Sequence, residues 1–382
     1  MKPLIFFLLI GISSVALGQT KTVKGRVVNA DNQNAVEFAN IGIVGTFFGT
    51  AGNADGFFEL KIPAELQSYN ITVSSMGYKP ETFPVSQWLS QEFVRVSLKE
   101  QAFMIESVSV EAQSRVLHRV IRTAIQQIQH NYMAGPFTLQ FYYLEQYSSG
   151  DSVVQTREGI VDLFDHTGYQ NTSIIDAFQN RGYRFTQAKK DFSSWSFSSG
   201  QNGFDELLEM DLVRLENTIM NEGIISDYTL SLERIVPFQG DSTMVISYRT
   251  TKPGVAHSGD SYALSLEGKL YVLKSSYTVV RNECIINSEK NNWQNRALFT
   301  NQNFQNNVSY RYVSIYNKVN DKYVLNYVEC NKSYINEKGE KLTYYRKANP
   351  VSFQPSVTGS TSRNYFEDSN YIENFWSSFE RP

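Results

Sequence analysis

The sequence contains few of the residue types on which most enzyme chemistry depends. It has four histidines, His118, His130, His166 and His257, and none of them stands in a His-Glu-x-x-His zinc-binding pair. The Gly-x-Ser-x-Gly turn of serine hydrolases and the Walker loop of nucleotide-binding enzymes are also missing. The sequence therefore predicts no catalytic residue, no metal site and no cofactor.

Cysteine is scarce as well, with only Cys284 and Cys330. Neither lies near the N-terminus, where a lipoprotein needs its lipid-bearing cysteine, so we expect no lipid anchor. Both lie in strand-like segments, and a disulfide can persist in the oxidising compartments that exported proteins meet. A Cys284–Cys330 disulfide and two free thiols remain alternatives, because pairing requires Cα atoms within roughly 7 Å.

Long apolar stretches are missing after the first 18 residues. Residues 1–18 have the features of a secretory signal peptide: Lys2, an apolar stretch at 4–12, and small residues before Gln19. A membrane-spanning helix needs about 20 apolar residues, and no segment of the sequence provides them. We expect an exported chain that lies in the periplasm or at the periphery of the outer membrane, without a transmembrane segment.

Neither sign of charge dominates, because 35 Lys and Arg face 38 Asp and Glu, for a net charge of −3. This balance argues against a nucleic-acid partner, which favours a basic patch or stripe. The length of 382 residues allows two or three domains at roughly 100–200 residues each.

Short β-strand patterns separated by turn residues fill the region up to residue 110, at 22–28, 38–44, 57–62, 69–75, 93–98 and 105–110. This spacing is typical of an antiparallel sandwich. Asn53-Ala54-Asp55-Gly56 predicts a hairpin turn, since glycine adopts positive φ at little cost. An amphipathic helix follows at 114–132, with Ser114 as its expected N-cap and Gly135-Pro136 as its stop.

The remainder of the chain returns to β-strand patterns. Strands are expected at 138–147, 153–164, 228–236, 243–250, 261–266, 269–281, 308–318, 322–335 and 341–347. Several of them alternate apolar and polar residues, which predicts a sheet with one buried face and one polar face. We expect a helix at 204–220, a loop at 193–203, and an aromatic tail at 365–379 that packs back on the domain.

Residues 19–112 resemble the carboxypeptidase regulatory-like (CarboxypepD_reg-like) domain, a transthyretin- or prealbumin-like β-sandwich. The resemblance rests on Ala39-Asn40-Ile41, on the Gly49-Thr50-Ala51-Gly52 and Asp55-Gly56-Phe57 segments, and on Met76-Gly77-Tyr78. Ala35 departs from the proline common in the family. The resemblance implies a domain without catalytic chemistry, typical of secreted and outer-membrane proteins of Bacteroidetes.

The second region is similar to the domain that follows this sandwich in uncharacterised exported proteins of Bacteroidetes. That likeness rests on Ile128-Gln129-His130-Asn131-Tyr132, Phe141-Tyr142-Tyr143, Gly268-Lys269-Leu270-Tyr271 and Asn374-Phe375-Trp376. We therefore predict a mainly β protein with a signal peptide at 1–18, the sandwich at 19–112, a linking helix at 113–135, and a β-rich domain at 136–382. Its larger antiparallel sheet is expected to curve into a half-barrel with a few helices.

Candidate ligand-binding residues are aromatic, because Tyr, Phe and Trp make up 14% of the sequence. Trp195 and Trp293 lie in polar loops, and Tyr271 and Tyr323 lie in strands. Aromatic residues line many small-molecule cavities, and they are equally common in the core of a sheet.

A second candidate site is polar. Glu158, Asp162, Asp165 and His166 cluster at the end of one strand and could serve acid–base or metal chemistry. A solvated strand terminus explains them as well.

Three functions stay open from the sequence. The first is a non-enzymatic envelope protein whose curved sheet binds an apolar or amphipathic ligand, such as a lipid or a glycan, or a partner protein of the outer membrane. The second is a hydrolase of envelope glycan or peptide, for which two carboxyl groups would converge in one cleft. The third is a docking module that uses an exposed strand edge at 22–28 or 105–110.

Overall fold

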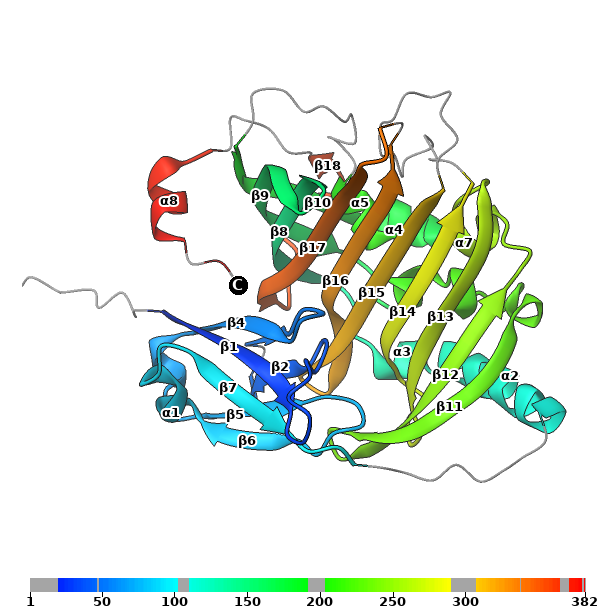
Figure 1. The fold of residues 1–382 in the computed structure, drawn as a ribbon, viewed down its shortest axis with the longest axis horizontal. Helices are drawn as coiled ribbons and strands as arrows, with labels where there is room; N and C mark the ends of the chain where they lie inside the picture. The colour runs from blue at the N-terminus through cyan, green and yellow to red at the C-terminus, as the bar shows by residue number, and fades with distance from the viewer. Residues whose placement is uncertain are drawn as a thin grey trace, which may run out of the picture.

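The chain is mainly β, with a small two-sheet sandwich at the N-terminus and a large open sheet that is covered by helices (Figure 1). The computed structural model describes residues 20–46, 48–101, 110–191, 203–289, 307–336, 338–364, 371–379 and 381. The predicted signal peptide and the two loop tryptophans, Trp195 and Trp293, lie outside these residues. No helix in the described part of the chain combines the length and the apolar character that crossing a membrane requires.

The sandwich consists of seven strands in two sheets. Its strands are β1 (Lys21–Asn29), β2 (Asn40–Ile43), β3 (Gly49–Ala51), β4 (Phe57–Ile62), β5 (Asn70–Ser74), β6 (Glu81–Pro84) and β7 (Val94–Leu98), with the short helices η1 (Ala64–Leu66) and α1 (Val85–Leu89). The sheet orders are β4-β1-β7 and β3-β2-β5-β6. Alternating apolar residues of both sheets, among them Val27, Leu60, Ile41 and Val73, form the core between them.

The turn at 53–56 forms as the sequence predicts, but the strands that it joins belong to different sheets. Asn53 Oδ1 accepts hydrogen bonds from the backbone N–H groups of Asp55 at 3.0 Å and Phe57 at 2.9 Å. Gly56 has φ +78°, and a Cβ there would lie 2.4 Å from the carbonyl oxygen of Val27. Only glycine fits this crossing from one sheet to the other.

The large sheet contains ten antiparallel strands, to which the two-residue β18 adds in parallel beside β10. The strands are β8 (Phe137–Ser149), β9 (Ser152–Asp165), β10 (Arg181–Lys190), β11 (Thr229–Phe238), β12 (Asp241–Thr250), β13 (Ala263–Leu273), β14 (Val279–Ser288), β15 (Val308–Val319), β16 (Lys322–Ile335), β17 (Lys341–Gln354) and β18 (Arg363–Asn364). Their order is β11-β12-β13-β14-β15-β16-β17-β8-β9-β10-β18, so the sheet is open.

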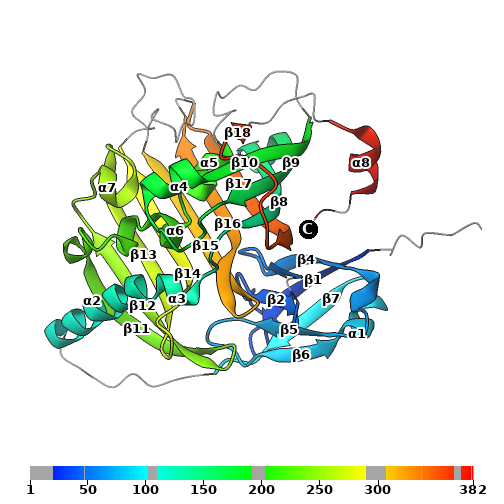
Figure 2. The same cartoon turned by 180° about the vertical axis from the view of Figure 1, so that it is seen from behind.

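Helices cover one face of this sheet, which we call the inner face (Figure 2). They are α2 (Val110–Gln126), α3 (Ile128–Asn131), α4 (Ile174–Asn180), α5 (Gly203–Leu208), α6 (Leu212–Leu215), η2 (Thr218–Met220), η3 (Ile225–Asp227) and α7 (Val255–Ser258). Leu117, Ile121 and Ala124 of α2 are buried at helical spacing and pack into one core with inner-face residues of the sheet. The opposite face of the sheet is called the outer face.

Several predicted boundaries are wrong. The linking helix begins at Val110, so Ser114 is not its N-cap and residue 110 is not the end of a strand. The segment at 204–220 is not one helix, because Glu216 and Thr218 have positive φ and separate α6 from η2. The predicted break between the strands at 261–266 and 269–281 is also wrong, because Gly268 does not interrupt the strand. It lies within β13, and the chain turns instead at 274–278, where Tyr277 has φ 59°.

The aromatic tail packs on the outer face, as its composition predicts. Helix α8 (Glu373–Ser378) places Trp376 against Tyr142 and Ile160, and the Trp376 indole N–H donates to the carbonyl of Ala188 at 3.2 Å. Phe379 stacks on Tyr142 with ring centroids 5.8 Å apart. The described part of the tail therefore covers the outer face of β8, β9 and β10.

The sandwich also docks on the outer face, over β15 and β16. Phe38 and Ala51 form a small apolar cluster with Val313, Ile315 and Tyr327. Phe38 is buried although its φ is 51°, an unusual conformation for a bulky residue. The guanidinium carbons of Arg281 and Arg311 lie 4.7 Å and 5.3 Å from the centre of its ring.

The strand register places one row of side chains across the whole outer face. Successive Cα partners are Ser231, Ser247, Lys269, Glu283, Val313, Glu329, Lys347, Leu144, Glu158 and Lys189. Six of these ten residues are charged. The sandwich and the tail cover the middle and one end of this row, and the β11–β14 end stays accessible.

Candidate functional site

The predicted polar cluster is not brought together by the fold. Glu158 and Asp162 point to the outer face of β9, about 13 Å apart along the strand, whereas Asp165 points to the inner face. His166 follows the strand, and its Nε2 atom has no hydrogen-bond partner among the described residues. The four residues therefore do not form one acid–base or metal site.

Each carboxylate of that cluster has its own cation. Glu158 pairs with Arg381 at 2.8 Å and accepts a hydrogen bond from Tyr142 at 2.6 Å. Burial alone would raise the pKa of Glu158, but the hydrogen bonds from Arg381 and Tyr142 outweigh it and lower the pKa. Asp162 lies 3.5 Å from Arg184. These contacts stabilise the ionised carboxylates.

Asp165 belongs to a buried ionic cluster under α4 and α6. Its carboxylate lies 2.9 Å from Arg214 and 3.3 Å from Arg181. Arg181 also contacts Asp211 at 2.7 Å, and Arg214 contacts Asp176 at 2.7 Å. The cluster therefore joins β9, β10 and the helix layer, which is a structural role.

A second buried cluster lies on the inner face of β8, β9 and β17. Glu145 contacts Arg157 at 2.5 Å and Arg346 at 2.8 Å, and it accepts a hydrogen bond from Tyr143 at 2.8 Å. Burial alone would raise the pKa of Glu145, but the two arginines outweigh it and lower the pKa. Glu206 of α5 pairs with both Arg346 and Lys332, and so ties the helix to the sheet.

The two cysteines are both free and buried, so the disulfide alternative is wrong. Each is a Cα partner of Tyr312, Cys284 from β14 and Cys330 from β16. Two interstrand spacings separate their Cα atoms by about 10 Å, which is beyond the reach of a disulfide. Burial raises the pKa of the Cys330 thiol to about 12, so this thiol is not a reactive nucleophile.

Alkylation tests this assignment directly. When the protein is denatured without reductant and treated with iodoacetamide, we expect intact-mass spectrometry to show two carbamidomethyl groups, because both thiols are free. The native protein should react with the reagent much more slowly, since both side chains are buried. A denatured protein that takes up no label before reduction would contradict the assignment.

The two predicted strand tyrosines lie in different surroundings. Tyr323 is buried against Tyr132 at the end of α3, with ring centroids 6.1 Å apart, and burial raises its pKa to about 12. Tyr271 lies on the outer face and donates a hydrogen bond to Glu283 at 2.7 Å. Both tyrosines are thus buried in the core, and Tyr271 contacts Glu283, which lines the pocket described next.

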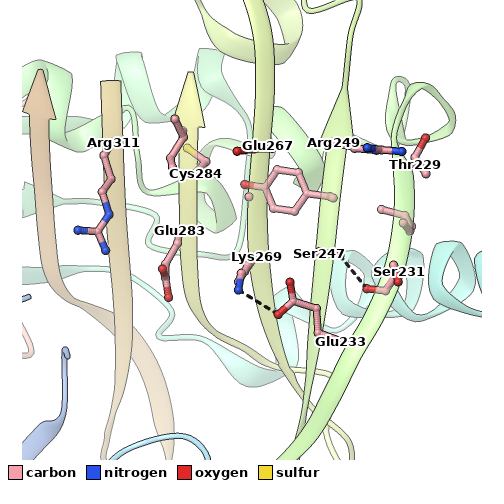
Figure 3. Close-up of a pocket in the computed structure, with 14 residues that line it drawn as sticks. Thr229, Ser231, Glu233, Ser247, Arg249, Glu267, Lys269, Glu283, Cys284 and Arg311 are labelled. Carbon is pink, nitrogen blue, oxygen red and sulfur yellow. Dashed lines mark hydrogen bonds and ion pairs between the residues drawn. The ribbon is translucent and has the colours of Figure 1, made fainter. Parts of the chain in front are cut away.

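An open pocket of about 530 Å³ lies on the outer face, across β11 to β15 (Figure 3). Its lining residues are Thr229, Leu230, Ser231, Glu233, Ser247, Tyr248, Arg249, Glu267, Gly268, Lys269, Glu283, Cys284, Ile285 and Arg311. Most of them alternate with core residues along each strand, so their side chains share the outer face. Leu230, Tyr248 and Cys284 border the pocket although they belong to the inner-face core.

Ion pairs fix several of the charged side chains in this pocket. Lys269 contacts Glu233 at 3.0 Å, as the dashed line in Figure 3 marks. Arg281, just outside the pocket, contacts Glu283 at 2.8 Å. Burial alone would raise the pKa of Glu283, but Arg281 and the hydrogen bond from Tyr271 outweigh it and lower the pKa. Glu283 is therefore held ionised.

Two charged side chains of the pocket are not paired. Arg249 on β12 and Glu267 on β13 are Cα partners, both are exposed, and neither has a side-chain hydrogen bond or ion pair to another described residue. Arg311, at the opposite wall, contacts Glu37 of the sandwich at 3.3 Å. Among the described residues, the pocket thus has an unpaired cation and an unpaired anion on neighbouring strands, and one wall is tied to the sandwich.

The pocket is suited to binding polar groups of either charge. Glu233, Glu267 and Glu283 can accept hydrogen bonds from an ammonium group, and Arg249, Lys269 and Arg311 can donate to a carboxylate. None of its described lining residues is a histidine. No group of three His, Cys, Asp or Glu side chains within the described ranges could hold a metal ion.

Sequence reasoning missed this pocket, although one signal for it was present. The apolar alternation in β11 and β16 indicated that the other face of the sheet is polar. It did not reveal which polar residues become neighbours, because Arg249 and Glu267 meet only through the pairing of two strands.

Comparison with known proteins identifies the first part of the chain. The sequence model of the CarboxypepD_reg-like domain matches residues 23–110, so the N-terminal sandwich is a domain of this family. No curated protein matches the chain.

Two solved structures resemble this chain weakly, with low sequence identity and low TM-scores. One is an outer membrane lipoprotein-sorting protein domain from Vibrio parahaemolyticus, with 9% identity and a TM-score of 0.25 over 70% of this chain and 98% of that domain. The other is lipovitellin, in a structure concerned with its lipid–protein interactions, with 10% identity and a TM-score of 0.28 over 65% of this chain and 29% of lipovitellin. TM-scores this low support no inference about this chain.

Proposed function

We propose that this chain is a non-enzymatic binding protein of the cell envelope, whose outer-face pocket binds a zwitterionic, peptide-like ligand. The observation that carries the proposal is the free pair Arg249 and Glu267 in a pocket of about 530 Å³. Ligand pockets usually span about 300–1,000 Å³ and use a few placed polar groups for specificity. The location in the envelope rests on the predicted signal peptide and on the CarboxypepD_reg-like domain.

The pocket favours binding over hydrolysis. A glycosidase needs one carboxyl group with a raised pKa as general acid, next to a second carboxylate. The pKa of Glu283, one of the pocket carboxyl groups, is lowered rather than raised. Glu158, Asp162 and Asp165, the carboxylates that the hydrolase hypothesis names, lie on different faces of β9 and are paired with arginines.

The inner face of the curved sheet offers an apolar ligand little room. It packs its aromatic side chains against the helices in one core. Phe141, Tyr143 and Phe185, for example, surround Phe204 of α5 with ring centroids about 6 Å apart, at 6.0, 5.8 and 6.2 Å. These rings are core residues.

The docking hypothesis loses one of the two strand edges on which it was based. Strand β1 pairs with β4 on one side and with β7 on the other, so residues 22–28 form a central strand. Most of the segment at 105–110 lies outside the described residues. A partner protein is therefore an alternative source of the peptide-like ligand. It would bind in the pocket and would not add a strand beside β1.

Isothermal titration calorimetry with the peptidoglycan stem tripeptide, which carries amines and carboxylates, tests the proposal. We expect Arg249→Ala and Glu267→Gln each to weaken binding about tenfold or more, because each removes one charged hydrogen bond. Neither side chain has a partner among the described residues, so the melting temperature should stay unchanged.

Matched controls are the exposed residues Lys252 and Glu92, which lie outside the pocket. Lys252→Ala and Glu92→Gln should bind the tripeptide as the unmodified protein does. Chitotriose, a neutral glycan, should bind weakly or not at all. The proposal is ruled out if the unmodified protein does not bind the tripeptide. It is also ruled out if Arg249→Ala binds the tripeptide as tightly as the unmodified protein.

A further inference from the structure

A second pocket lies between the sandwich and the large sheet. It has a volume of about 330 Å³ and is lined by Lys24, Gly25, Thr50, Ala51, Asn53, Phe57, Phe58, Glu59 and Phe93 of the sandwich, and by Tyr142, Leu144, Tyr327, Lys347, Asn349 and Arg381. Its walls thus come from both domains and from the tail. The outer-face pocket at β11–β15 shares none of these residues.

Two polar side chains of β17 in this pocket have no partner. Lys347 and Asn349 are two residues apart on the same face of the strand. Lys347 makes no hydrogen bond and no ion pair with another described residue. Asn349 is only 3% exposed, and its Oδ1 has no hydrogen-bond partner. Buried polar groups are nearly always hydrogen-bonded. Lys347 can only donate and so lacks an acceptor, whereas Asn349 Oδ1 can only accept and so lacks a donor.

The other cations of the pocket are already compensated. Lys24 contacts Glu59 at 2.9 Å, and Arg381 pairs with Glu158. The carboxyl group opposite Lys347 is Glu329, which accepts hydrogen bonds from Tyr327 at 2.6 Å and Tyr345 at 3.1 Å. Burial raises the pKa of Glu329, which disfavours its ionised form. Lys347 is therefore the cation whose charge is left without a contact.

Lys347 is partly exposed, and the desolvation of its charge carries a free-energy cost that a bound anion would offset. Desolvation lowers the pKa of Lys347, and Glu59 and Glu329 only partly oppose it. A cation removed from water without a hydrogen-bonded partner is unfavourable, and an anion at contact distance reverses that effect. The site therefore selects for negative charge.

The mouth of the pocket is aromatic. Phe57 and Phe93 are 45% and 50% exposed, and their ring centroids lie 6.4 Å apart. Exposed large apolar side chains that border a charged pocket provide a contact surface for the apolar part of a ligand. Tyr142 and Leu144 continue this apolar surface inward from the large sheet.

We infer that this interdomain pocket binds a small amphipathic carboxylate. Its carboxylate accepts hydrogen bonds from the Lys347 ammonium and from the Nδ2 amide of Asn349, and its apolar body lies against Phe57 and Phe93. A free fatty acid and the C-terminal carboxylate of an apolar peptide share this chemistry. The inference is independent of the function proposed for the outer-face pocket.

Calorimetric titrations of the full chain with octanoate and with N-acetylphenylalanine distinguish these two sources. We expect at least one of the two carboxylates to bind. Acetate, which lacks the apolar body, and octanol, which lacks the charge, should bind at least about tenfold more weakly. The better of the two ligands identifies the source as fatty acid or peptide terminus. Octanol binding as tightly as octanoate, or no binding of either carboxylate, would overturn the inference.

The variant Lys347→Met removes the charge and keeps most of the length of the side chain. Without ligand it should melt at the same temperature as the unmodified protein or higher, because an uncompensated buried cation is lost. Its affinity for the carboxylate should fall about tenfold or more, whereas Lys252→Met should leave affinity unchanged. A lower melting temperature together with unchanged affinity would show that Lys347 is a structural residue and would refute the site.

Discussion

Replacing Glu145 by Gln is expected to lower the free energy of unfolding by about 3–5 kcal/mol. The side chain of Glu145 is fully buried and contacts Arg157 at 2.5 Å and Arg346 at 2.8 Å. Gln preserves the shape and removes the negative charge, so two buried guanidinium groups lose a counter-charge. Among the described residues, Arg346 and Lys332 also pair with Glu206, so the loss of the Glu145 charge leaves Glu206 as the acid that Arg346 contacts.

The effect should depend on pH in a defined direction. The folded state lowers the pKa of Glu145, so its stabilising contribution is present above the unfolded value of about 4.3 and is lost as the pH falls through the lower folded value. The difference in stability between Glu145→Gln and the unmodified protein should therefore be largest at neutral pH. It should shrink below about pH 4.

Urea denaturation at several pH values measures both expectations. The matched control is Glu233→Gln, the same change at the partly exposed ion pair with Lys269, which should cost about 1 kcal/mol or less. If the two variants were equally stable at neutral pH, the inner-face cluster would not contribute as its burial indicates.

Replacing Phe38 by Ala is expected to detach the sandwich from the large sheet. Among the residues that the sandwich contributes to this cluster, Phe38 has the largest apolar side chain. It packs on Val313, Ile315 and Tyr327. Truncation of a buried Phe costs about 3–5 kcal/mol. It also removes the ring on which Arg281 and Arg311 lie at 4.7 Å and 5.3 Å. Apolar packing from the sandwich side of this cluster would then come from Ala51 and Ala54, beside the polar contacts Arg311–Glu37 at 3.3 Å and Asn317–Asn40 at 2.7 Å.

Small-angle X-ray scattering and limited proteolysis detect this change. We expect Phe38→Ala to have a larger radius of gyration and faster cleavage between the sandwich and α2, with both domains still folded by circular dichroism. Tyr69→Ala is the control, because Tyr69 is an exposed aromatic of the same sandwich and lies outside the docking cluster. An unchanged scattering profile for Phe38→Ala would mean that other contacts hold the domains together.

Local sequence signals predicted much of the fold. The turn at Asn53 to Gly56 and the strands around it are specified by residues that are close in the chain, and the family model at residues 23–110 agrees with them. The tail was predicted to pack because of its aromatic content, and Trp376 and Phe379 do pack. Helix boundaries were less accurate. Val110 extends the linking helix, and the positive φ of Glu216 interrupts the next predicted helix.

Candidate sites were harder to predict, because they depend on strand register. Asp162 and Asp165 look alike in the sequence, yet one faces the outer surface and the other faces the core, since side chains alternate along β9. Cys284 and Cys330 both lie in strand-like segments, and only the strand order shows that Tyr312 on the strand between them keeps them apart.

The sequence by itself determined the mainly β composition, the CarboxypepD_reg-like sandwich and the polar face of the large sheet, because these follow from residue types repeated at short spacing. Only the tertiary structure decided that Arg249 meets Glu267 in one pocket and that Lys347 meets the aromatic rings of the sandwich in another. The physical reason is that both pockets are built from residues far apart in the chain. Strand pairing and domain docking bring them together, and neither can be read from a local pattern.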